Sequence, residues 1–337
     1  MNDRASGALT GLALGDALGM PTQNLPRALI RRRYGDVLDD LHPGPEENEI
    51  SRGLPAGRVT DDTDQAVILG QLLVAGGGSV DPRAFADALL RWEDRMRAQG
   101  SLDLLGPSTR RALDAVGRGV PVQDAGRWGD TNGAAMRVAP IGVAVACEPL
   151  PRLVDAVEQA SRVTHGTGIA IAGAAAIAAA VSSGVEGRPI GESLRLAVRA
   201  ARLGAERGSY VPGADVAARI EWALELVGDV PAAAALELVP RLVGTGLATQ
   251  EAVPAALAVA ALFPGDVWDA CRHAASLGGD CDTVAAMTGA VVGAHAGARG
   301  VPPAVLDRLR AANPGLDLPG LADALLTLRG AGPLPAG

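Results

Sequence analysis

The stretch GTGIAIAGAAAIAAAVSSGV, residues 166–185, contains no charged side chain and constrains the fold more than any other segment. At about 20 residues, such a helix is long enough to cross a bilayer. Most of its residues are alanine and glycine, however, which partition weakly into lipid, and it also contains threonine and serine. The sequence therefore predicts a helix buried at the centre of the protein, and we expect no membrane partner.

The composition of the chain favours helices that pack closely on one another. Hydrophobic residues make up 48% of the 337 residues but aromatic residues only 2%, so the core must consist of Ala, Leu, Val and Ile. Alanine and leucine are strong helix formers, and the β-branched and aromatic runs that are typical of strands are scarce. No charge run or Ser-rich linker divides the sequence. We therefore expect an all-α fold with a single domain over residues 1–337.

Helical periodicity, punctuated by glycine and proline, predicts most of the helices. We expect them over Ser6–Gly19, TDDTDQAVILGQLLV, Pro82–Met96, Arg110–Val116, Leu153–Val163, Ile169–Val181, Ser193–Gly204, Ala214–Val227, Glu251–Phe263, Val267–Ala275 and the segment after GGDCDT. The segment Tyr34–Val59 is too long for a simple connector, so residues 34–59 are predicted to form a lid loop. The Leu/Pro/Gly-rich residues 315–337 are predicted to pack loosely.

The charge and the side-chain inventory exclude several functions. The chain has no lysine, which excludes a Schiff-base lysine and a P-loop lysine. Its net charge of −8 argues against nucleic acid as a general partner. The four histidines, His42, His165, His273 and His295, lack the spacing of a zinc site. Three cysteines are too few, and odd in number, for a disulfide framework, so we expect a reducing, cytoplasmic location.

Two acidic clusters each precede a strongly apolar stretch that we expect to be helical: TDDTDQ at residues 60–65 and GGDCDT at residues 278–283. Helix capping explains each of them alone, and Asp62 with Gln65 three positions later fits a capping box. Together they resemble two halves of one site. Both place paired acids and a threonine at a helix N-terminus, where free backbone N–H groups and the helix dipole favour anions.

If the two helices lie side by side, Asp61, Asp62, Asp280 and Asp282 converge. Two like charges about 4 Å apart repel by roughly 4 kcal/mol at an effective dielectric constant of about 20. Four carboxylates without cations would therefore protonate or push the helices apart, whereas two divalent cations would balance them. Carboxylate and threonine oxygens are hard ligands that favour Mg²⁺ or Mn²⁺ over zinc. The residues therefore indicate a two-metal site with oxygen ligands.

Other polar residues lie near the two clusters in the predicted helices. The apolar stripe of the first helix continues onto Asp16, which is therefore expected on a buried face, either behind the acidic clusters or satisfied by backbone groups. Asp64 and Gln65 are expected on the helix surface or in its cap. Cys281, between two acids, is expected to point into the helix packing as a small hydrophobic residue.

Five motifs occur along the chain in the order GALTGLALGDALGMPTQ, VTDDTDQAV, NGAAMRVAPIG, RVTHGTG and LGGDCDTVAAMTGAVVGA. With them the sequence resembles the ADP-ribosylglycohydrolases, including dinitrogenase-reductase-activating glycohydrolases and animal ADP-ribosyl-acceptor hydrolases, from about Gly7 to Gly297. The resemblance implies a compact, orthogonal bundle of many helices with two divalent cations, Mg²⁺ or Mn²⁺. It also implies hydrolysis of the glycosidic bond at C1 of ribose, in an ADP-ribosylated protein or a smaller ribosyl substrate.

The resemblance assigns roles to individual residues as well. The implied metal ligands are Thr60, Asp61, Asp62, Asp280, Asp282 and Thr283. The implied substrate-binding residues are Gln23, Asn132, Gly133 and His165. Asp61 and Asp62 are the implied catalytic residues. From the residues alone, His165 fits a hydrogen-bonded core histidine equally well, and the Asn-Gly pair fits an ordinary turn.

Two positions depart from the family's pattern. Gln23 stands where many members carry glutamate, and because glutamine cannot take a proton, the base would be Asp61 or Asp62. Asp130, in the WGDT segment, would repel a pyrophosphate if it pointed inward. Both departures favour an alternative substrate, a small free N-riboside. A non-catalytic alternative also stays open, either an ADP-ribose-binding protein or a structural protein like the jellyfish J crystallins, which the family resembles.

Overall fold

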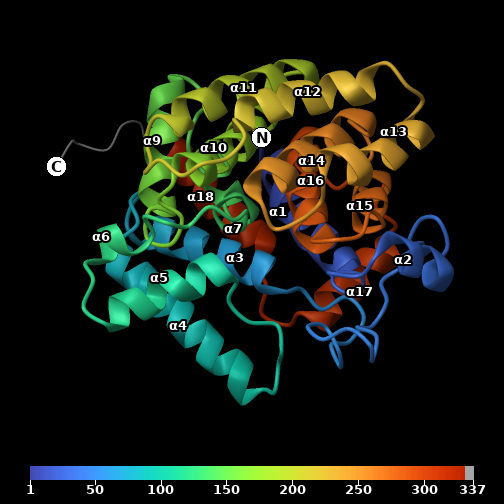
Figure 1. Ribbon diagram of the computed structural model, residues 1–337, viewed down its shortest axis with the longest axis horizontal. Helices are drawn as coiled ribbons and strands as arrows, with labels where there is room; N and C mark the ends of the chain where they lie inside the picture. The colour runs from blue at the N-terminus through green and yellow to red at the C-terminus, as the bar shows by residue number, and fades with distance from the viewer. Residues whose placement is uncertain (331–337) are drawn as a thin grey trace.

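Helices form the regular structure in the part of the chain that the structure, a computed structural model, describes (residues 1–330). Those residues contain eighteen α-helices, one short π-helix and, in place of any strand, only isolated β-bridges such as that between Leu25 and Gly279. The all-α prediction is therefore confirmed (Figure 1).

The helices have the following bounds in chain order. The first nine are α1 (Asn2–Gly19), α2 (Arg27–Tyr34), α3 (Asp61–Ala75), α4 (Pro82–Ala98), α5 (Pro107–Gly117), α6 (Val122–Ala125), α7 (Gly133–Met136), α8 (Ala139–Ala144) and α9 (Leu150–Ser161). The others are α10 (Gly168–Val185), α11 (Ile190–Ala205), α12 (Val216–Gly228), α13 (Ala232–Leu238), the π-helix η1 (Val239–Val243), α14 (Thr249–Leu262), α15 (Val267–Ala275), α16 (Cys281–Ala296), α17 (Pro303–Ala312) and α18 (Leu318–Gly330).

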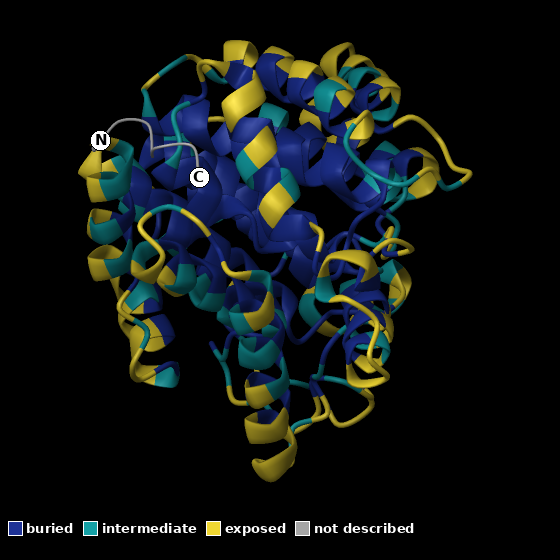
Figure 2. Ribbon diagram, turned by 90° about the vertical axis from the view of Figure 1, so that its left-hand side faces the viewer, coloured by how far each residue is buried: buried dark blue, intermediate teal, exposed yellow. Residues whose placement is uncertain are grey.

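Helix α10 is the uncharged stretch, and it lies inside the protein. It is long and apolar enough to span a membrane by length and composition, but 94% of it is buried within the fold. Small residues allow a close approach by α11, because a Cβ atom added at Gly204 would lie 2.9 Å from Cα of Ala172. Figure 2 shows this buried interior surrounded by helices whose outer faces are exposed. The predicted buried central helix is therefore present.

A row of glycines brings α1 and α16 into backbone contact. Cβ atoms added at Gly11 and Gly289 would lie 2.1 Å and 2.0 Å from the carbonyl oxygen of the other glycine. Gly7 meets Gly293 in the same way, and a Cβ atom at Gly19 would lie 2.2 Å from Cα of Asp282. Glycines four positions apart lie on one face of a helix, so the contact runs along the whole of α1. This contact places the start of α16 beside the end of α1.

The predicted lid segment is a long irregular loop between α2 and α3 that is tied down at several points. The backbone N–H of Leu38 donates to the hydroxyl of Ser276, and the side-chain amide of Asn48 donates to the carbonyl oxygen of Gln23, 2.8 Å away. Ile50 reaches the cavity described below. Closure of this loop over a ligand stays a prediction.

The C-terminal residues differ from the expected loose packing. Residues 318–330 form α18, which packs on α1, α3 and α8 and buries Leu318, Ala322 and Leu325. Arg329, at its end, donates to backbone oxygens at the end of α8 and pairs with Glu186. A leucine stripe and one arginine therefore fix a segment that its Pro and Gly content suggested was loose, and residues 331–337 lie outside the described residues.

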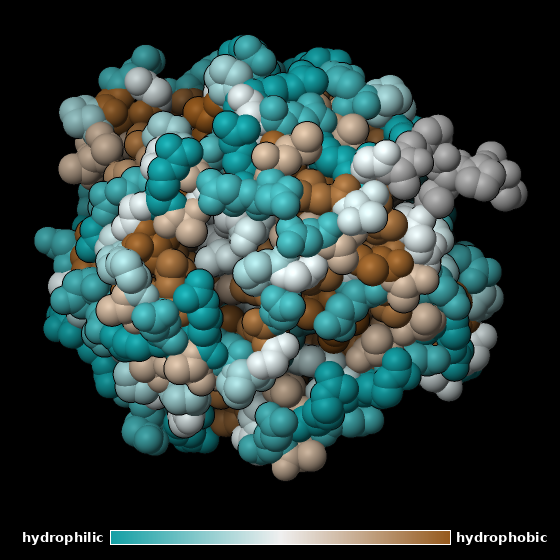
Figure 3. Space-filling model, turned by 180° about the vertical axis from the view of Figure 1, so that it is seen from behind, coloured by the Kyte–Doolittle hydropathy of each residue, from teal (hydrophilic) through white to brown (hydrophobic). Residues whose placement is uncertain are grey.

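The face of the molecule seen from behind is mainly hydrophilic (Figure 3). The face seen from behind has small apolar areas separated by polar side chains (Figure 3). This agrees with the amphipathic outer helices, since α4, α9 and α11 bury one side and expose the other.

Candidate metal and substrate site

The two acidic clusters lie at the N-termini of α3 and α16. Thr60 is the N-cap of α3, and its hydroxyl oxygen accepts a hydrogen bond of 3.4 Å from the backbone N–H of Asp62. Asp280 precedes α16, but its side chain makes no capping hydrogen bond. The capping box predicted for Asp62 and Gln65 is wrong, because Thr60 caps the helix and Gln65 points inward. Capping therefore does not explain the carboxylates.

The clusters meet in one cavity of about 280 Å³. Asp61, Asp62, Asp280, Asp282 and Thr283 all line it, and the hydroxyl of Thr283 donates to Asp62 Oδ2 over 3.3 Å. The convergence expected from the sequence is therefore present. Its cause is the glycine contact between α1 and α16, together with the docking of α3 on α1.

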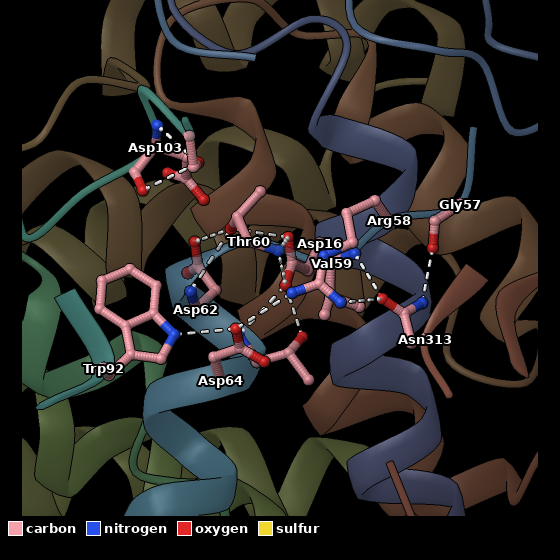
Figure 4. A network of polar contacts seen from close by, with 12 residues as sticks. Asp16, Gly57, Arg58, Val59, Thr60, Asp62, Asp64, Trp92, Asp103 and Asn313 are labelled. Carbon is pink, nitrogen blue, oxygen red and sulfur yellow. Dashed lines mark hydrogen bonds and ion pairs between the residues drawn. The ribbon is translucent and has the colours of Figure 1, made fainter. Parts of the chain in front are cut away.

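Asp16 of α1 holds the start of α3 from behind. Its carboxylate accepts hydrogen bonds of 3.0 and 3.1 Å from the backbone N–H groups of Thr60 and Thr63, and further bonds from both threonine hydroxyls. Figure 4 shows Asp16, Thr60 and Asp62 facing one another. Burial raises the pKa of Asp16 to about 6, although these hydrogen bonds act in the opposite direction. Asp16 thus fixes the position of the Thr60–Asp62 segment.

Burial and mutual repulsion make the cavity unfavourable for bare carboxylates. Burial raises the pKa values of Asp61, Asp62 and Asp282 well above the usual value for aspartate, and neighbouring carboxylates raise them further. Burial also raises the pKa of Asp280, whereas a 2.5 Å hydrogen bond from the side-chain amide of Asn132 lowers it. The cluster therefore favours a positively charged ligand or protons.

The donor atoms suit hard cations. All six predicted ligands offer oxygen, and the Oδ1 atoms of Asp62 and Asp282 are buried without a hydrogen-bond partner. A buried carboxylate oxygen without a partner is costly, and a hard cation with oxygen ligands would satisfy it. Within residues 1–330, no three Asp, Glu, His or Cys side chains form a ready metal cage. The six residues therefore fit a hard divalent cation by the chemistry of their oxygen atoms and by their burial.

Asp103 is an acidic residue of the cavity that sequence reasoning missed. It comes from the loop between α4 and α5, is 6% exposed, and accepts a hydrogen bond from the backbone N–H of Asp61. Burial, then the nearby Asp16 and Asp62 charges, raise its pKa well above the usual value. The one signal in the sequence is an acid flanked by leucines in SLDLLG.

The predicted substrate residues line the same cavity. Gln23 is buried, and its side-chain nitrogen has no hydrogen-bond partner. A Cβ atom at Gly133 would lie 2.7 Å from Cε1 of His165, so glycine leaves room for the imidazole ring. Asp130 is exposed and is not among the lining residues in the described chain. Asp130 does not point into the cavity, so its charge would not repel a pyrophosphate bound there.

Of the two residues expected on the helix surface or in its cap, Gln65 is buried and Asp64 is partly buried. Gln65 is fully buried and donates from Nε2 to Asp61 Oδ2 over 2.7 Å. Asp64 accepts a hydrogen bond of 2.8 Å from the Trp92 indole and lies 3.5 Å from a nitrogen of Arg58. The prediction for Gln65 was wrong, and Asp64 is only partly exposed, because α3 is covered on this side by α4 and by the cavity wall. Cys281 is buried against Thr22, as expected.

An all-helical chain with two acidic helix N-termini at one polar cavity is the arrangement that the family resemblance implies. Residues 1–333 match the sequence model of the ADP-ribosylglycohydrolase family. The chain therefore belongs to the ADP-ribosylglycohydrolase family.

Individual relatives match along most of the chain. The uncharacterized protein YegU of Escherichia coli (strain K12) is 36% identical over 328 residues, which cover 97% of each chain. The ADP-ribosylarginine hydrolase Tri1 of Pseudomonas putida (strain GB-1) is 29% identical over 91% of this chain and 74% of Tri1. A solved structure described as an ADP-ribosylglycohydrolase-related protein complex matches with a TM-score of 0.68 and 30% identity, covering 97% of this chain and 98% of its own.

Proposed function

We propose that this protein is a divalent-cation-dependent hydrolase that cleaves the glycosidic bond at C1 of ribose in an ADP-ribosyl or related ribosyl substrate. The observation that carries the proposal is the meeting of the α3 and α16 acids in one cavity with Asn132 and His165. Family membership supports the reaction class, and the hydrolase Tri1 supports an ADP-ribosylated substrate.

The residues that would hold Mg²⁺ or Mn²⁺ are those at the two helix N-termini, namely Thr60, Asp61, Asp62, Asp280, Asp282 and Thr283. Bound there, divalent cations would supply Lewis acidity, which anchors ribose hydroxyls and makes a water molecule easier to deprotonate. The partnerless oxygens of Asp62 and Asp282 support this assignment. Asp16 would keep Thr60 in place by accepting hydrogen bonds from its backbone N–H and its hydroxyl, and Asp16 does not itself line the cavity.

The proton of the attacking water would pass to a carboxylate of the α3 pair. Each carboxylate already has one oxygen engaged, since Oδ2 of Asp62 accepts from Thr283 and Oδ2 of Asp61 accepts from Gln65. Asp61 or Asp62 would accept the proton as positive charge develops at ribose C1. Gln23 would donate a hydrogen bond to the substrate through its free amide nitrogen, and it cannot act as the base.

A small N-riboside is a second candidate substrate, and two observations favour it. The cavity of about 280 Å³ is at the small end for ligand pockets, which typically run from about 300 to 1,000 Å³. Within the described chain, the lining residues include five aspartates and no arginine, so no cationic side chain faces a pyrophosphate there. Backbone N–H groups near Gly133 would have to bind any phosphate.

A substrate panel tests the proposal. Purified protein with Mg²⁺ or Mn²⁺ is incubated with ADP-ribosyl-arginine, ADP-ribosyl-serine and simple nucleosides, and released ADP-ribose or ribose is quantified. We expect turnover of at least one class and none with Asp62→Asn. Release of ribose alone would select the second candidate. ADP-ribose binding without any product would instead support the non-catalytic alternative and overturn the proposal.

A further inference from the structure

A buried arginine links Gln65, which contacts Asp61, to Thr164 and through it to His165 of the cavity wall. Arg137 is 1% exposed, and its guanidinium lies over the Phe85 ring, 4.9 Å from the ring centre. One nitrogen donates to Gln65 Oε1 over 2.8 Å, and another donates to the hydroxyl oxygen of Thr164 over 2.5 Å. Burying a charged guanidinium on neutral partners is unfavourable, so its position calls for an explanation.

A guanidinium can only donate hydrogen bonds, and this sets the direction of the contacts on both sides. Because Gln65 must present its oxygen to Arg137, its nitrogen faces Asp61, where it donates over 2.7 Å. By fixing the orientation of the Gln65 amide, Arg137 therefore keeps the N–H group of Gln65 directed at the Asp61 carboxylate. An inverted Gln65 amide would place oxygen against oxygen there.

The other side of Arg137 leads to His165. The Thr164 hydroxyl oxygen accepts from Arg137, and within residues 1–330 the one acceptor for the hydroxyl hydrogen is His165 Nδ1, 2.7 Å away, so donation to Nδ1 satisfies both groups. Since Nδ1 then accepts, the neutral imidazole carries its proton on Nε2. Nε2 lies 3.0 Å from the hydroxyl oxygen of Thr131 and donates to it. Burial, and then the nearby Arg137 charge, lower the pKa of His165 well below its usual value, which favours the neutral ring.

Thr131 ends this chain of contacts at the cavity wall. Its hydroxyl oxygen accepts from His165, and its hydrogen has no acceptor among the side chains and backbone groups of residues 1–330. We infer that Thr131 is a substrate-binding hydrogen-bond donor, directed by Arg137 through Thr164 and His165, toward an acceptor oxygen of the ribosyl substrate. Arg137 and His165 are then positioning residues. This inference rests on the proposed function only in taking the cavity as the substrate site.

The tautomer of His165 is measured directly by long-range ¹H–¹⁵N NMR on the ¹⁵N-labelled full chain, with the His165→Asn variant to assign the signal. We expect a neutral ring protonated at Nε2 from pH 6 to pH 8. A ring protonated at Nδ1, or a charged ring at pH 7, would overturn the inference. In Arg137→Lys, which keeps the charge but loses the planar fork, we expect a mixture of tautomers. An unchanged single tautomer in Arg137→Lys would show that Arg137 does not direct His165. If that variant does not fold, the wild-type signal still decides which ring nitrogen of His165 carries the proton.

The donor role of Thr131 is tested with ADP-ribose as the probe, by calorimetric titration in the presence of Mg²⁺. Thr131→Val should weaken binding by about tenfold, the size of one neutral hydrogen bond, and Thr131→Ser, which keeps the hydroxyl, should stay within about threefold. Equal affinities for the two variants would exclude the donor role. If the wild-type chain does not bind ADP-ribose, the ADP-ribosyl form of the proposed function fails, whereas the NMR measurement still decides the tautomer.

Discussion

The hydroxyl of Thr283 on α16 donates to the carboxylate of Asp62 on α3, across 3.3 Å and 221 positions of sequence. This contact joins the two acidic helix N-termini directly. The other carboxylate oxygen of Asp62, Oδ1, is buried without a hydrogen-bond partner.

Neutralising either acidic cluster should abolish turnover without unfolding the protein. Asp62→Asn and Asp282→Asn keep the side-chain shape but remove a negative charge from the cavity, so we expect kcat/KM to fall at least about a hundredfold. The matched control is Asp229→Asn, at an exposed position after α12, which should keep wild-type activity. Circular dichroism checks the fold. Wild-type turnover in both cavity variants would contradict the metal mechanism.

Divalent cations should stabilise the protein, and more strongly at high pH. Burial raises the pKa of Asp16 from 3.8 to about 6, so the folded cation-free protein binds more protons than the unfolded chain in that interval. The stabilisation that comes from the proton bound to Asp16 in the folded protein is thus fully present below pH 3.8 and is lost as the pH rises through about 6. The raised pKa values of Asp61, Asp62 and Asp282 act in the same direction.

Cations compete with the protons on Asp61, Asp62 and Asp282 for the same carboxylate oxygens. In thermal unfolding, Mg²⁺ or Mn²⁺ at about a hundredfold excess over Kd should raise Tm by about 4 °C or more at pH 8, and by less at pH 5.5. Chelation should reverse the shift, and Asp282→Asn should abolish it. A Tm that does not respond to either cation at any pH would argue against the site.

Acidification should cost stability through His165. Its pKa in the folded protein is well below 6.5, so the unfolded chain binds the additional proton as the pH falls below 6.5. The contribution of the neutral ring is therefore present above pH 6.5 and is lost on acidification, by about 1 kcal/mol over the first pH unit below that value. Denaturant unfolding of wild type and His165→Asn at pH 7.5 and 5.5 measures it. The stability gap between the two should narrow at pH 5.5, and a constant gap would contradict the prediction.

A single methyl group between α1 and α16 should be severely destabilising. In Gly11→Ala the new Cβ atom would lie 2.1 Å from a backbone oxygen of Gly289, which cannot move aside without displacing the helix. We expect a loss of about 3 kcal/mol or more. Gly117→Ala at the end of α5 is the control, because no atom lies within 4 Å of the added Cβ, and it should be neutral or slightly stabilising. Urea titration of both variants checks the difference.

Local chemistry made much of this protein predictable. The small, apolar residues of 166–185 predicted a buried helix, and helix α10 is that segment. The paired acids ahead of apolar helices predicted a shared site, and Asp61, Asp62, Asp280 and Asp282 do line one cavity. Periodicity and charge repulsion are properties of short segments, so they can be read from the sequence without knowing the contacts.

The side chains that support the site could not be predicted in this way. Gln65 was expected on the surface and is buried, because α3 is enclosed by neighbours that come from distant parts of the chain. Asp103, which lines the cavity, and Arg137, which contacts Gln65 and Thr164, carried no local signal strong enough to predict those positions. The burial of a polar group depends on what packs over it.

By itself, the sequence determined the class of fold, the two acidic helix starts and the absence of any lysine from the chemistry. Only the tertiary structure decided that α1 and α16 touch through glycine, that α18 is packed, and that Arg137 stands between Gln65 and Thr164. The physical reason is that helix propensity and charge act over a few residues, whereas desolvation and hydrogen-bond direction are set by groups brought together from across the whole chain.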